Sequence, residues 1–267
     1  EEENLHNFDN EDTGLNIRKY IYLILSNWYW FALALLLSVG TAYMINRYTN
    51  PVYSTNATLI LNDQEKNQGV QNVLSEMRAV RYWRRRQVVE NEIMKLKSYD
   101  LARRTLKKLN FNIGYTAHGR IRDSKTYHGH DIRVEPDTSY AWQSGKRVHV
   151  YILSREKYRL KTEGKSGLDT IMNFGESFRN KQFWFSVYLN NPNYSIDHHS
   201  FVFRTNEQLA SKYRGKLQIS QVRDNSSILQ LSMKGAVPQM LVDYLNTFME
   251  SYIQYDLEQK NRMTENS

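Results

Sequence analysis

Residues 23–61 read LILSNWYWFALALLLSVGTAYMINRYTNPVYSTNATLIL. The first part of this stretch belongs to a segment, residues 20–46, that contains no Asp, Glu, Lys or Arg. A helix of about 20 apolar residues is long enough to cross the ~30 Å hydrocarbon core of a bilayer. Aromatic residues typical of membrane–water interfaces lie near both ends: Trp28, Tyr29, Trp30, Tyr43 and Tyr48. A buried core helix and a signal peptide are the alternatives, but a signal peptide has a shorter apolar core and small residues at its cleavage site. The sequence therefore predicts a transmembrane helix at 20–47, after a leader at 1–19.

The composition is that of a folded, basic protein. Of the 267 residues, 40% are hydrophobic and 24% are charged, which is ordinary for a folded chain. The 36 Lys and Arg residues exceed the 28 Asp and Glu residues, so the formal net charge is +8. This excess suggests a phosphate, a lipid headgroup or an acidic polymer as a partner, although many basic proteins bind none of these. The sequence has no cysteine, which excludes disulfides, thiolate nucleophiles and thiolate metal ligands within it.

The segment after the apolar run predicts a strand followed by two helices. Residues 52–61 alternate between a larger, more apolar set and a small polar set, which is typical of a half-buried strand. Apolar residues then recur mostly three or four apart, as in a helix: Val73, Met77, Val80, Val89, Ile93 and Leu96. Ser98 can cap a second helix that has Asp100 in its first turn and Lys107 in its last turn.

From about residue 112 to residue 205 the pattern changes to period two. Short alternating segments occur at 131–135, 147–153, 157–162, 183–189 and 201–205. Turn signals such as QSGK, EGKSG and NNPN separate them. Several short strands at roughly regular spacing predict a small β-sandwich or jelly roll.

The last block predicts two strands, at 216–220 and 227–233, and then a long helix that Pro238 opens. An apolar stripe along this helix would face the core: Leu241, Leu245, Phe248, Tyr252 and Tyr255. Further apolar residues lie beside the stripe: Met240, Tyr244, Met249, Ile253 and Leu257. They widen it beyond one core-facing side, and this surplus predicts a homo-oligomer. Small residues in the apolar run, such as Gly40, would also allow close helix packing.

Together these patterns predict an α+β fold. It would consist of an N-terminal transmembrane helix, an exported α/β domain at 48–111 and 206–267 that ends in a long C-terminal helix, and a β-rich, jelly-roll-like insert at 112–205.

Three segments resemble Wzz-type chain-length determinant proteins, the polysaccharide co-polymerases. INRYTNPVYSTNATLIL (45–61) resembles their first membrane helix and exit strand, and VVENEIMKLKSYDLARRTLKKLN (88–110) resembles their helix pair. SSILQLSMKGAVPQMLVDYLNTFMESYIQYDLEQKN (226–261) is similar to their late strand and the helix that follows it. The β-rich insert resembles the larger members that are fused to a cytoplasmic tyrosine autokinase in Bacteroidetes-like bacteria. The order of the pieces, over residues 15 to about 262, carries the resemblance.

The resemblance implies an inner-membrane protein with a cytoplasmic leader and its main domain in the periplasm. The charges beside the apolar run, Arg18 and Lys19 against Arg47, favour this orientation by only one residue. The implied function is to regulate the chain length or the export of a capsular polysaccharide or exopolysaccharide. The implied partners are identical subunits in a ring, often eight, together with a polysaccharide polymerase, an outer-membrane export protein and membrane lipid, but no nucleic acid. The family also has a second membrane helix and, in the autokinases, a nucleotide-binding kinase domain, so we expect this sequence to be a portion of a longer protein.

No catalytic motif is found. EGKSG (163–167) ends like a phosphate-binding loop, but Arg159 stands where the first glycine is required, so a turn between strands is the simpler interpretation. HGH (128–130) and DHH (197–199) have neither the helical i, i+4 spacing of metal-binding histidines nor an obvious third partner. The sequence therefore predicts no catalytic, cofactor-binding or metal-binding residue and no cofactor.

Two other classes of function stay open. A periplasmic adaptor of an efflux or secretion system, similar to membrane-fusion proteins, would usually show long heptad hairpins or lipoyl-like repeats. A nucleic-acid binder is suggested only by the charge, and an exported domain argues against it.

An arginine-rich segment, MRAVRYWRRRQ (77–87), is the candidate contact site. Its candidate residues are Arg78, Arg81, Arg84, Arg85, Arg86 and Trp83. Guanidinium groups match phosphate and carboxylate oxygens in a bidentate way, and aromatic rings offer flat faces to sugars. The segment would therefore contact a lipid-linked phosphate or an acidic glycan. The alternative is a solvated helix face that pairs with nearby glutamates (Glu76, Glu90 and Glu92) or with acidic residues of a neighbouring subunit.

Overall fold

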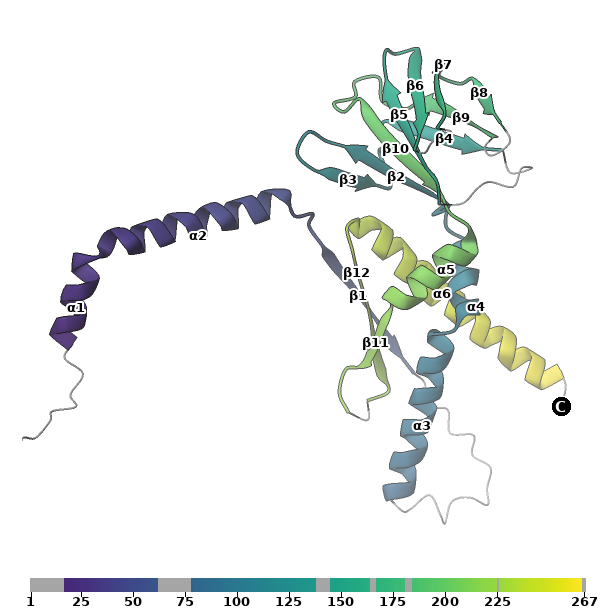
Figure 1. The fold of residues 1–267 in the computed structure, drawn as a ribbon. Helices are drawn as coiled ribbons and strands as arrows, with labels where there is room; N and C mark the ends of the chain where they lie inside the picture. Colours follow the sequence, from purple (N-terminus) through teal and green to yellow (C-terminus); the bar gives the residue numbers. More distant parts are fainter. Residues whose placement is uncertain are drawn as a thin grey trace, which may run out of the picture. The chain divides into compact units, whose positions relative to one another are not determined.

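The computed structural model describes residues 17–61, 78–137, 145–163, 167–180, 184–224 and 226–265. The chain divides into two units, Glu1–Thr49 and Asn50–Ser267. The described part of the first unit is helical, whereas the second mixes helices with antiparallel sheets (Figure 1). This mixture confirms the α+β class.

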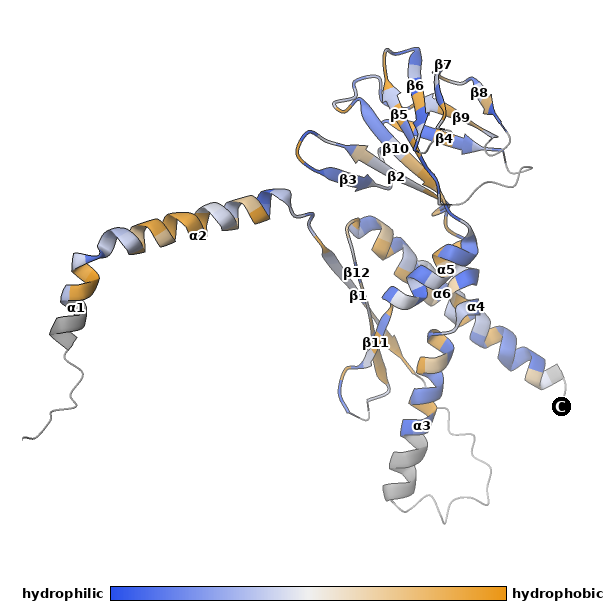
Figure 2. Ribbon diagram, in the orientation of Figure 1, coloured by the Kyte–Doolittle hydropathy of each residue, from blue (hydrophilic) through white to orange (hydrophobic). Residues whose placement is uncertain are grey.

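The first unit contains two helices, α1 (Ile17–Ser26) and α2 (Trp28–Tyr48). They meet at Asn27, whose side-chain Nδ2 donates to the Leu23 carbonyl at 2.9 Å. The predicted span at 20–47 is therefore not one continuous helix. The segment that is long and apolar enough to cross a membrane is α2, whose 21 residues extend for about 30 Å at 1.5 Å per residue. Figure 2 shows apolar residues along its middle, and none of its hydrophobic side chains is buried by the protein.

A three-stranded sheet forms the base of the second unit, in the order β1-β12-β11. Its strands are β1 (Tyr53–Ile60), β12 (Ile228–Gly235) and β11 (Gln218–Gln221), and each neighbouring pair is antiparallel. β1 pairs with β12 over its whole length, from Tyr53 opposite Gly235 to Ile60 opposite Ile228. The three strands confirm the predictions for residues 52–61, 216–220 and 227–233. Alternate residues of β12 are buried, so one face of this sheet lies on the core.

Four helices pack with this sheet: α3 (Arg78–Leu96), α4 (Tyr99–Lys107), α5 (Asn206–Lys216) and α6 (Pro238–Glu265). The Ser98 side chain accepts a hydrogen bond from the Leu101 backbone N–H at 3.3 Å, which confirms the predicted cap of α4. The sequence did not predict α5. Thr205 was assigned to the end of a strand, but it caps α5 instead, accepting from the Gln208 backbone N–H.

The core between these helices and the sheet takes residues from all four helices and from β1 and β12. The predicted stripe on α6 is confirmed for Leu241, Leu245, Phe248 and Tyr252, which are buried. Tyr244, predicted as surplus apolar surface, is wholly buried in the same core and stacks on Phe248. The prediction that Tyr244 contributes to an oligomer contact was wrong, because the core contacts a wider part of the α6 surface than the predicted stripe. Ile253 and Leu257 are more than half exposed.

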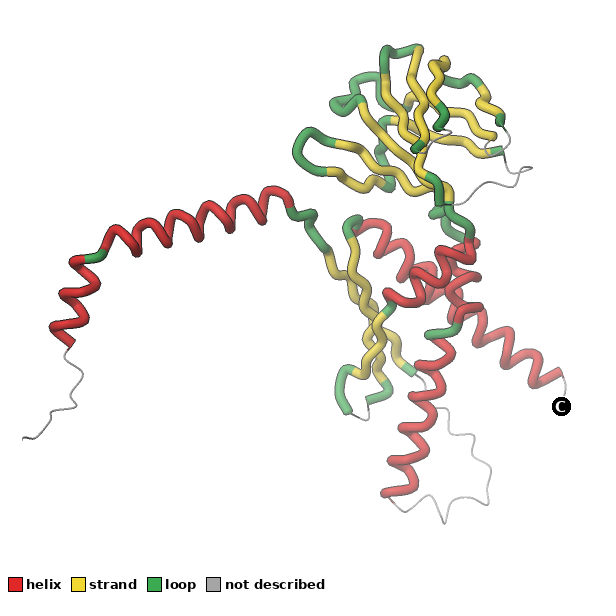
Figure 3. Tube along the Cα trace, viewed as in Figure 1, coloured by secondary structure: helices red, strands yellow, loops and turns green. Residues whose placement is uncertain are grey.

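We call residues 113–203 the insert, and residues 50–112 with 204–265 the α/β half. Figure 3 shows only strands and loops among the described residues of the insert. A six-stranded antiparallel sheet has the order β3-β2-β10-β5-β6-β7, and a three-stranded sheet has the order β4-β9-β8. The strands are β2 (Ile113–His118), β3 (Asp123–Thr126), β4 (Ile132–Pro136), β5 (Arg147–Ile152), β6 (Lys157–Thr162), β7 (Asp169–Asn173), β8 (Ser177–Arg179), β9 (Trp184–Leu189) and β10 (His198–Phe203).

Five of these strands, β4, β5, β6, β9 and β10, confirm sequence predictions. The bounds of β10 differ from the prediction in a way that brings His198 into the strand. β10 begins at His198 and ends at Phe203, whereas the prediction began at residue 201. β2, β3, β7 and β8 were not predicted, because they are short or contain too few apolar residues for an alternating pattern.

The two sheets of the insert share one core. Phe185 on β9 lies 5.2 Å from Phe201 and 5.9 Å from Phe203, both on β10, measured between ring centroids. Such aromatic contacts between layers bury large apolar areas. Because these core-facing residues alternate with outward-facing ones, the six-stranded sheet has a second face turned away from the core.

The chain enters and leaves the insert at neighbouring points. The Arg204 backbone N–H donates to the Asn112 carbonyl at 2.7 Å. The Asn112 side chain donates to the Arg204 carbonyl at 3.1 Å and to Asn206 Oδ1 at 3.0 Å. These bonds join the two crossings between the insert and the α/β half.

Candidate functional site

The arginine-rich segment lies on the first half of α3, which begins at Arg78. The side chains of residues 78–85 lie outside the described part of the structure. On a helix the spacing of Arg78, Arg81 and Arg85 would place them on one face, flanked by Arg84 and Arg86, and this stays a prediction. The contact expected of Trp83 also stays a prediction.

Arg86, the last of the six candidate residues, is described. Its Nε donates to Glu90 Oε1 at 2.9 Å, one helical turn away. Both side chains are more than half exposed, so this pair stabilises the helix by only about 0.3–0.5 kcal/mol. Glu92, another expected partner, contacts Lys95 at 2.6 Å and accepts from the Tyr252 hydroxyl at 2.8 Å. Pairing with glutamates is thus observed for one arginine of the segment.

Three histidines from distant parts of the sequence meet on the outward face of the six-stranded sheet. His198 on β10 lies opposite Tyr151 on β5, and Ser200 lies opposite His149. On the other side of β10, His199 pairs with Ala117, which places His198 beside His118 of β2. One nitrogen from each of His118, His149 and His198 lies within 4.8 Å of the others. We call these three residues the histidine cluster.

The rings of the cluster contact one another closely. His149 Nδ1 lies 3.0 Å from His198 Nε2, within hydrogen-bonding distance. The His198 ring stacks between His118 and Tyr151, with both centroid distances at 4.2 Å. Burial, followed by the neighbouring His118 and His149, lowers the pKa of His198 to about 4. His198 is therefore a neutral imidazole at neutral pH.

Polar side chains contact the ring nitrogens of His118 and His149. His118 Nδ1 lies 2.9 Å from Asp123 Oδ1, and His118 Nε2 lies 2.8 Å from Ser200 Oγ. His149 Nε2 lies 3.0 Å from Glu163 Oε1. The two imidazoles are largely covered, with 13% of each side chain exposed, whereas Asp123 and Glu163 are mostly exposed. Asp123 and Glu163 thus orient two imidazoles that are largely shielded from solvent.

The other histidines singled out in the sequence lie elsewhere. His199 faces the opposite side of β10, where its Nε2 lies 2.8 Å from the Ile196 carbonyl. His130 stacks on Tyr115 at 4.1 Å, and burial lowers the pKa of its imidazole. His128 lies 3.6 Å from Asp243 of α6. The DHH motif therefore supplies only His198, and its partners come from β2 and β5.

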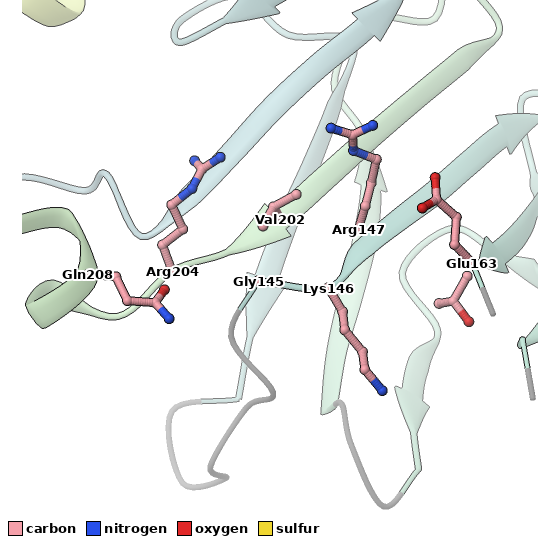
Figure 4. A pocket seen from close by; sticks show the side chains of 8 residues that line it. Gly145, Lys146, Arg147, Glu163, Val202, Arg204 and Gln208 are labelled. Atoms are coloured by element: carbon pink, nitrogen blue, oxygen red, sulfur yellow. The ribbon is translucent and has the colours of Figure 1, made fainter. Parts of the chain in front are cut away.

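Figure 4 shows an open pocket whose lining includes Glu163, the residue that contacts His149 of the cluster. Its lining residues are Gly145, Lys146, Arg147, Thr162, Glu163, Val202, Arg204 and Gln208. Its volume of ≈ 550 Å³ falls within the ~300–1,000 Å³ of small-molecule pockets. Arg147 and Arg204 extend to the same side in Figure 4, and Lys146 extends away from them.

The charges of this pocket favour an anionic ligand. Three cationic side chains, Lys146, Arg147 and Arg204, accompany one carboxylate, Glu163. Guanidinium groups bind carboxylate or phosphate oxygens in a bidentate way. Sequence reasoning missed these residues because they come from the start of β5, the residue before it, the residue after β6 and the segment after β10, and no single motif contains them.

In the comparisons with known proteins, no family model and no curated protein matched this sequence.

Proposed function

We propose that this chain is the membrane-anchored periplasmic part of a polysaccharide co-polymerase in a bacterial inner membrane. It would regulate the chain length or the export of a capsular polysaccharide or exopolysaccharide. The observation that supports this most is the link between the apolar helix and the folded unit. Only residues 49–52 separate α2 from β1, and β1 pairs fully with β12, the strand that leads into α6. This order of elements is the one that the resemblance implies.

In this proposal the insert is a jelly-roll-like module that contacts the polymer. Two antiparallel sheets around one core support the first part. The cationic pocket supports the second part, because uronic acids and phosphorylated sugars carry the anionic oxygens that guanidinium groups bind.

The proposal also includes a ring of identical subunits. Exposed apolar residues on α6, such as Ile253 and Leu257, and the exposed apolar surface of α2 support contacts between copies. A polysaccharide polymerase and an outer-membrane export protein would be the further partners. A tyrosine kinase domain would belong to the full-length protein.

Polymer length in the host tests the function. A strain that lacks the full-length gene should make polysaccharide of altered length or yield, and the wild-type gene should restore it. An R147Q/R204Q double variant should restore assembly, measured as native mass, but not the normal length distribution. R155Q, which changes an exposed arginine in the β5–β6 turn outside the pocket, is the matched control. An unchanged polymer in the deletion strain would overturn the proposed function, and an unchanged polymer in the double variant would remove the pocket from it.

The arginine segment of α3 is tested in the same strain. R81Q/R85Q should shift the polymer length while the oligomer stays intact, if these side chains contact a lipid-linked phosphate or the glycan. Loss of the oligomer would instead favour pairing between subunits, and an unchanged polymer with intact assembly would discard the contact.

The absence of cysteine from the sequence gives a direct test of location. A single Arg155→Cys variant should react with a membrane-impermeant maleimide in cells whose outer membrane has been permeabilised. An Asn10→Cys variant in the leader should react only after lysis. The reverse pattern would place the folded unit in the cytoplasm and contradict the proposal.

A further inference from the structure

We propose that the histidine cluster is a binding site for a divalent transition metal of the Zn²⁺ class, with His118, His149 and His198 as its protein ligands. The site does not depend on the proposed function. It would join three neighbouring strands, β2, β10 and β5, on the outward face of the six-stranded sheet.

The positions of the nitrogens suit such an ion. Zinc binds imidazole nitrogen at about 2.0–2.1 Å, so two ligands of a tetrahedral ion lie roughly 3.4 Å apart. His149 Nδ1 and His198 Nε2 are 3.0 Å apart, so one edge of that tetrahedron is nearly formed. The widest separation within the cluster is 4.8 Å or less. The wider separations must therefore shorten, by rotation of the side chains, for three nitrogens to reach one ion.

The groups behind two of the ligands match the usual surroundings of metal-binding histidines. Such a histidine normally donates its second ring N–H to a carboxylate, a carbonyl or water, and this fixes the tautomer and the ring orientation. Asp123 occupies that position at His118 Nδ1, and Glu163 occupies it at His149 Nε2. These contacts leave His118 Nε2 and His149 Nδ1 as the lone-pair donors. His149 Nδ1 already faces His198, and His118 Nε2 contacts Ser200, which would give up that contact.

The present stacking would change when a metal binds. A metal ion lies in the plane of each imidazole that binds it, and the His118 and His198 rings are stacked at 4.2 Å with 21° between their planes. At least one of the two rings must therefore turn out of the stack. Three imidazoles leave one position of a tetrahedral ion open to solvent, as in zinc sites that keep a water ligand.

A purely structural role is the alternative that the experiment must separate. Stacked rings on neighbouring strands stabilise a sheet without any ion. In that case removing a ring would lower stability, but added metal would have no effect. Metal-dependent stabilisation is the observation that distinguishes the two roles.

The experiment is an isothermal calorimetric titration in which zinc chloride is added to the full chain in lipid nanodiscs. The protein must be purified without a polyhistidine tag, since a tag would bind zinc itself. One zinc ion should bind per chain and should raise the melting temperature relative to the protein in EDTA. No binding by the wild-type chain, or binding without any effect on melting, would overturn the proposal.

Matched histidine variants locate the site. H118N and H149N should each weaken zinc binding at least tenfold, whereas H128N should bind like the wild type. His128 is the control because it is well exposed and lies outside the cluster. Circular dichroism in EDTA checks that each variant folds, and a variant that fails to fold is replaced by H198Q. Equal weakening in the control and the cluster variants would overturn the assignment.

Two further measurements test the assignment independently. Co²⁺ in place of zinc should give the visible absorption of a tetrahedral site in the wild type, and H149N should lose it. E163Q should weaken zinc binding by about 10–100-fold, because it removes the carboxylate that orients His149. A cobalt spectrum that H149N leaves unchanged would place the metal elsewhere and contradict the proposal.

Discussion

The α/β half and the insert bury their apolar residues in two separate clusters. In the α/β half, the core lies between helices and one face of a sheet, and polar contacts between helices surround it. In the insert, the core lies between two sheets, and the outward face of the larger sheet carries the histidine cluster and the cationic pocket.

The α/β half therefore contributes mainly a helix–sheet core, whereas the insert carries the candidate binding residues on its surface. In the α/β half, β1, which directly follows α2, pairs with the late strand β12. This pairing joins the segments that precede and follow the insert in the sequence. The chain crosses between the two halves at residues 112 and 204. Tyr127 and His128 of the insert also contact the α/β half, at Phe111 and Asp243. Because the two cores are separate, the outward face of the insert can change without disturbing the core of the other half. We therefore expect the two halves to respond separately to mutation.

Removing one large core side chain from each half tests this separation most strongly. F248A in the α/β half and F185A in the insert should each cost about 3–5 kcal/mol of unfolding free energy, since both side chains are buried. Hydrogen exchange with mass spectrometry should show faster exchange mainly in the half that carries the substitution.

The exposed Ile171 on β7 provides the control for these two variants. I171A should change stability by less than about 0.5 kcal/mol, because the side chain is 61% exposed. If F185A and F248A accelerate exchange equally in both halves, the halves unfold as one unit, and the comparison fails.

The next largest effect is expected between α3 and α6. The buried Tyr252 hydroxyl donates to the Glu92 carboxylate at 2.8 Å, and burial together with this carboxylate raises the pKa of Tyr252. Y252F should cost about 1.5–3 kcal/mol, because it leaves a largely covered carboxylate with one hydrogen bond fewer. Urea unfolding measures this loss, and Y53F, at a more exposed tyrosine of β1, should leave the midpoint nearly unchanged.

The α/β half could be predicted from the sequence in more detail than the candidate site. Apolar spacing along one helix identified Leu241, Leu245 and Phe248, and local capping chemistry identified Ser98. Both signals come from residues within a few positions of each other. They fail where the local pattern is ambiguous, as at Thr205, which caps a helix but also continues an alternating strand.

The histidine cluster shows why the rest could not be predicted. His118, His149 and His198 share a face only because β10 lies between β2 and β5, and strand order is not encoded in the spacing along the chain. The period-two pattern does place His149 and Tyr151 opposite the buried Val148 and Val150. Without knowledge of which strands pair, this pattern indicates only that one face of β5 is turned away from the core.

The junction between the halves should matter less than either core. Asn112 makes two side-chain hydrogen bonds there, to the Arg204 carbonyl and to Asn206. N112A should cost about 1–3 kcal/mol, at roughly 0.5–1.5 kcal/mol for each of the two neutral hydrogen bonds. Exchange should rise at both crossings while both cores stay protected. A loss of protection throughout the insert would show that its folding depends on this junction.

The smallest effect is expected at the surface of the α/β half, between α4 and α6. Arg104 contacts Glu258 of α6 at 2.9 Å and Asp100 of its own helix at 2.8 Å. Its guanidinium also lies 5.3 Å from the centre of the Tyr255 ring. The hydrogen bonds that Arg104 donates to Asp100 and Glu258 raise the pKa of its guanidinium, so it stays charged. The side chains of Arg104 and Glu258 are 40% and 37% exposed, so water and salt screen their attraction. E258Q should therefore cost only about 0.2–1 kcal/mol in low salt, and less in high salt. Urea unfolding at two salt concentrations measures both values. A loss as large as that of Y252F, or one that salt does not reduce, would show that the contact between α4 and α6 depends on a desolvated ion pair. The polar contacts of this half would then contribute as much to its stability as its core does.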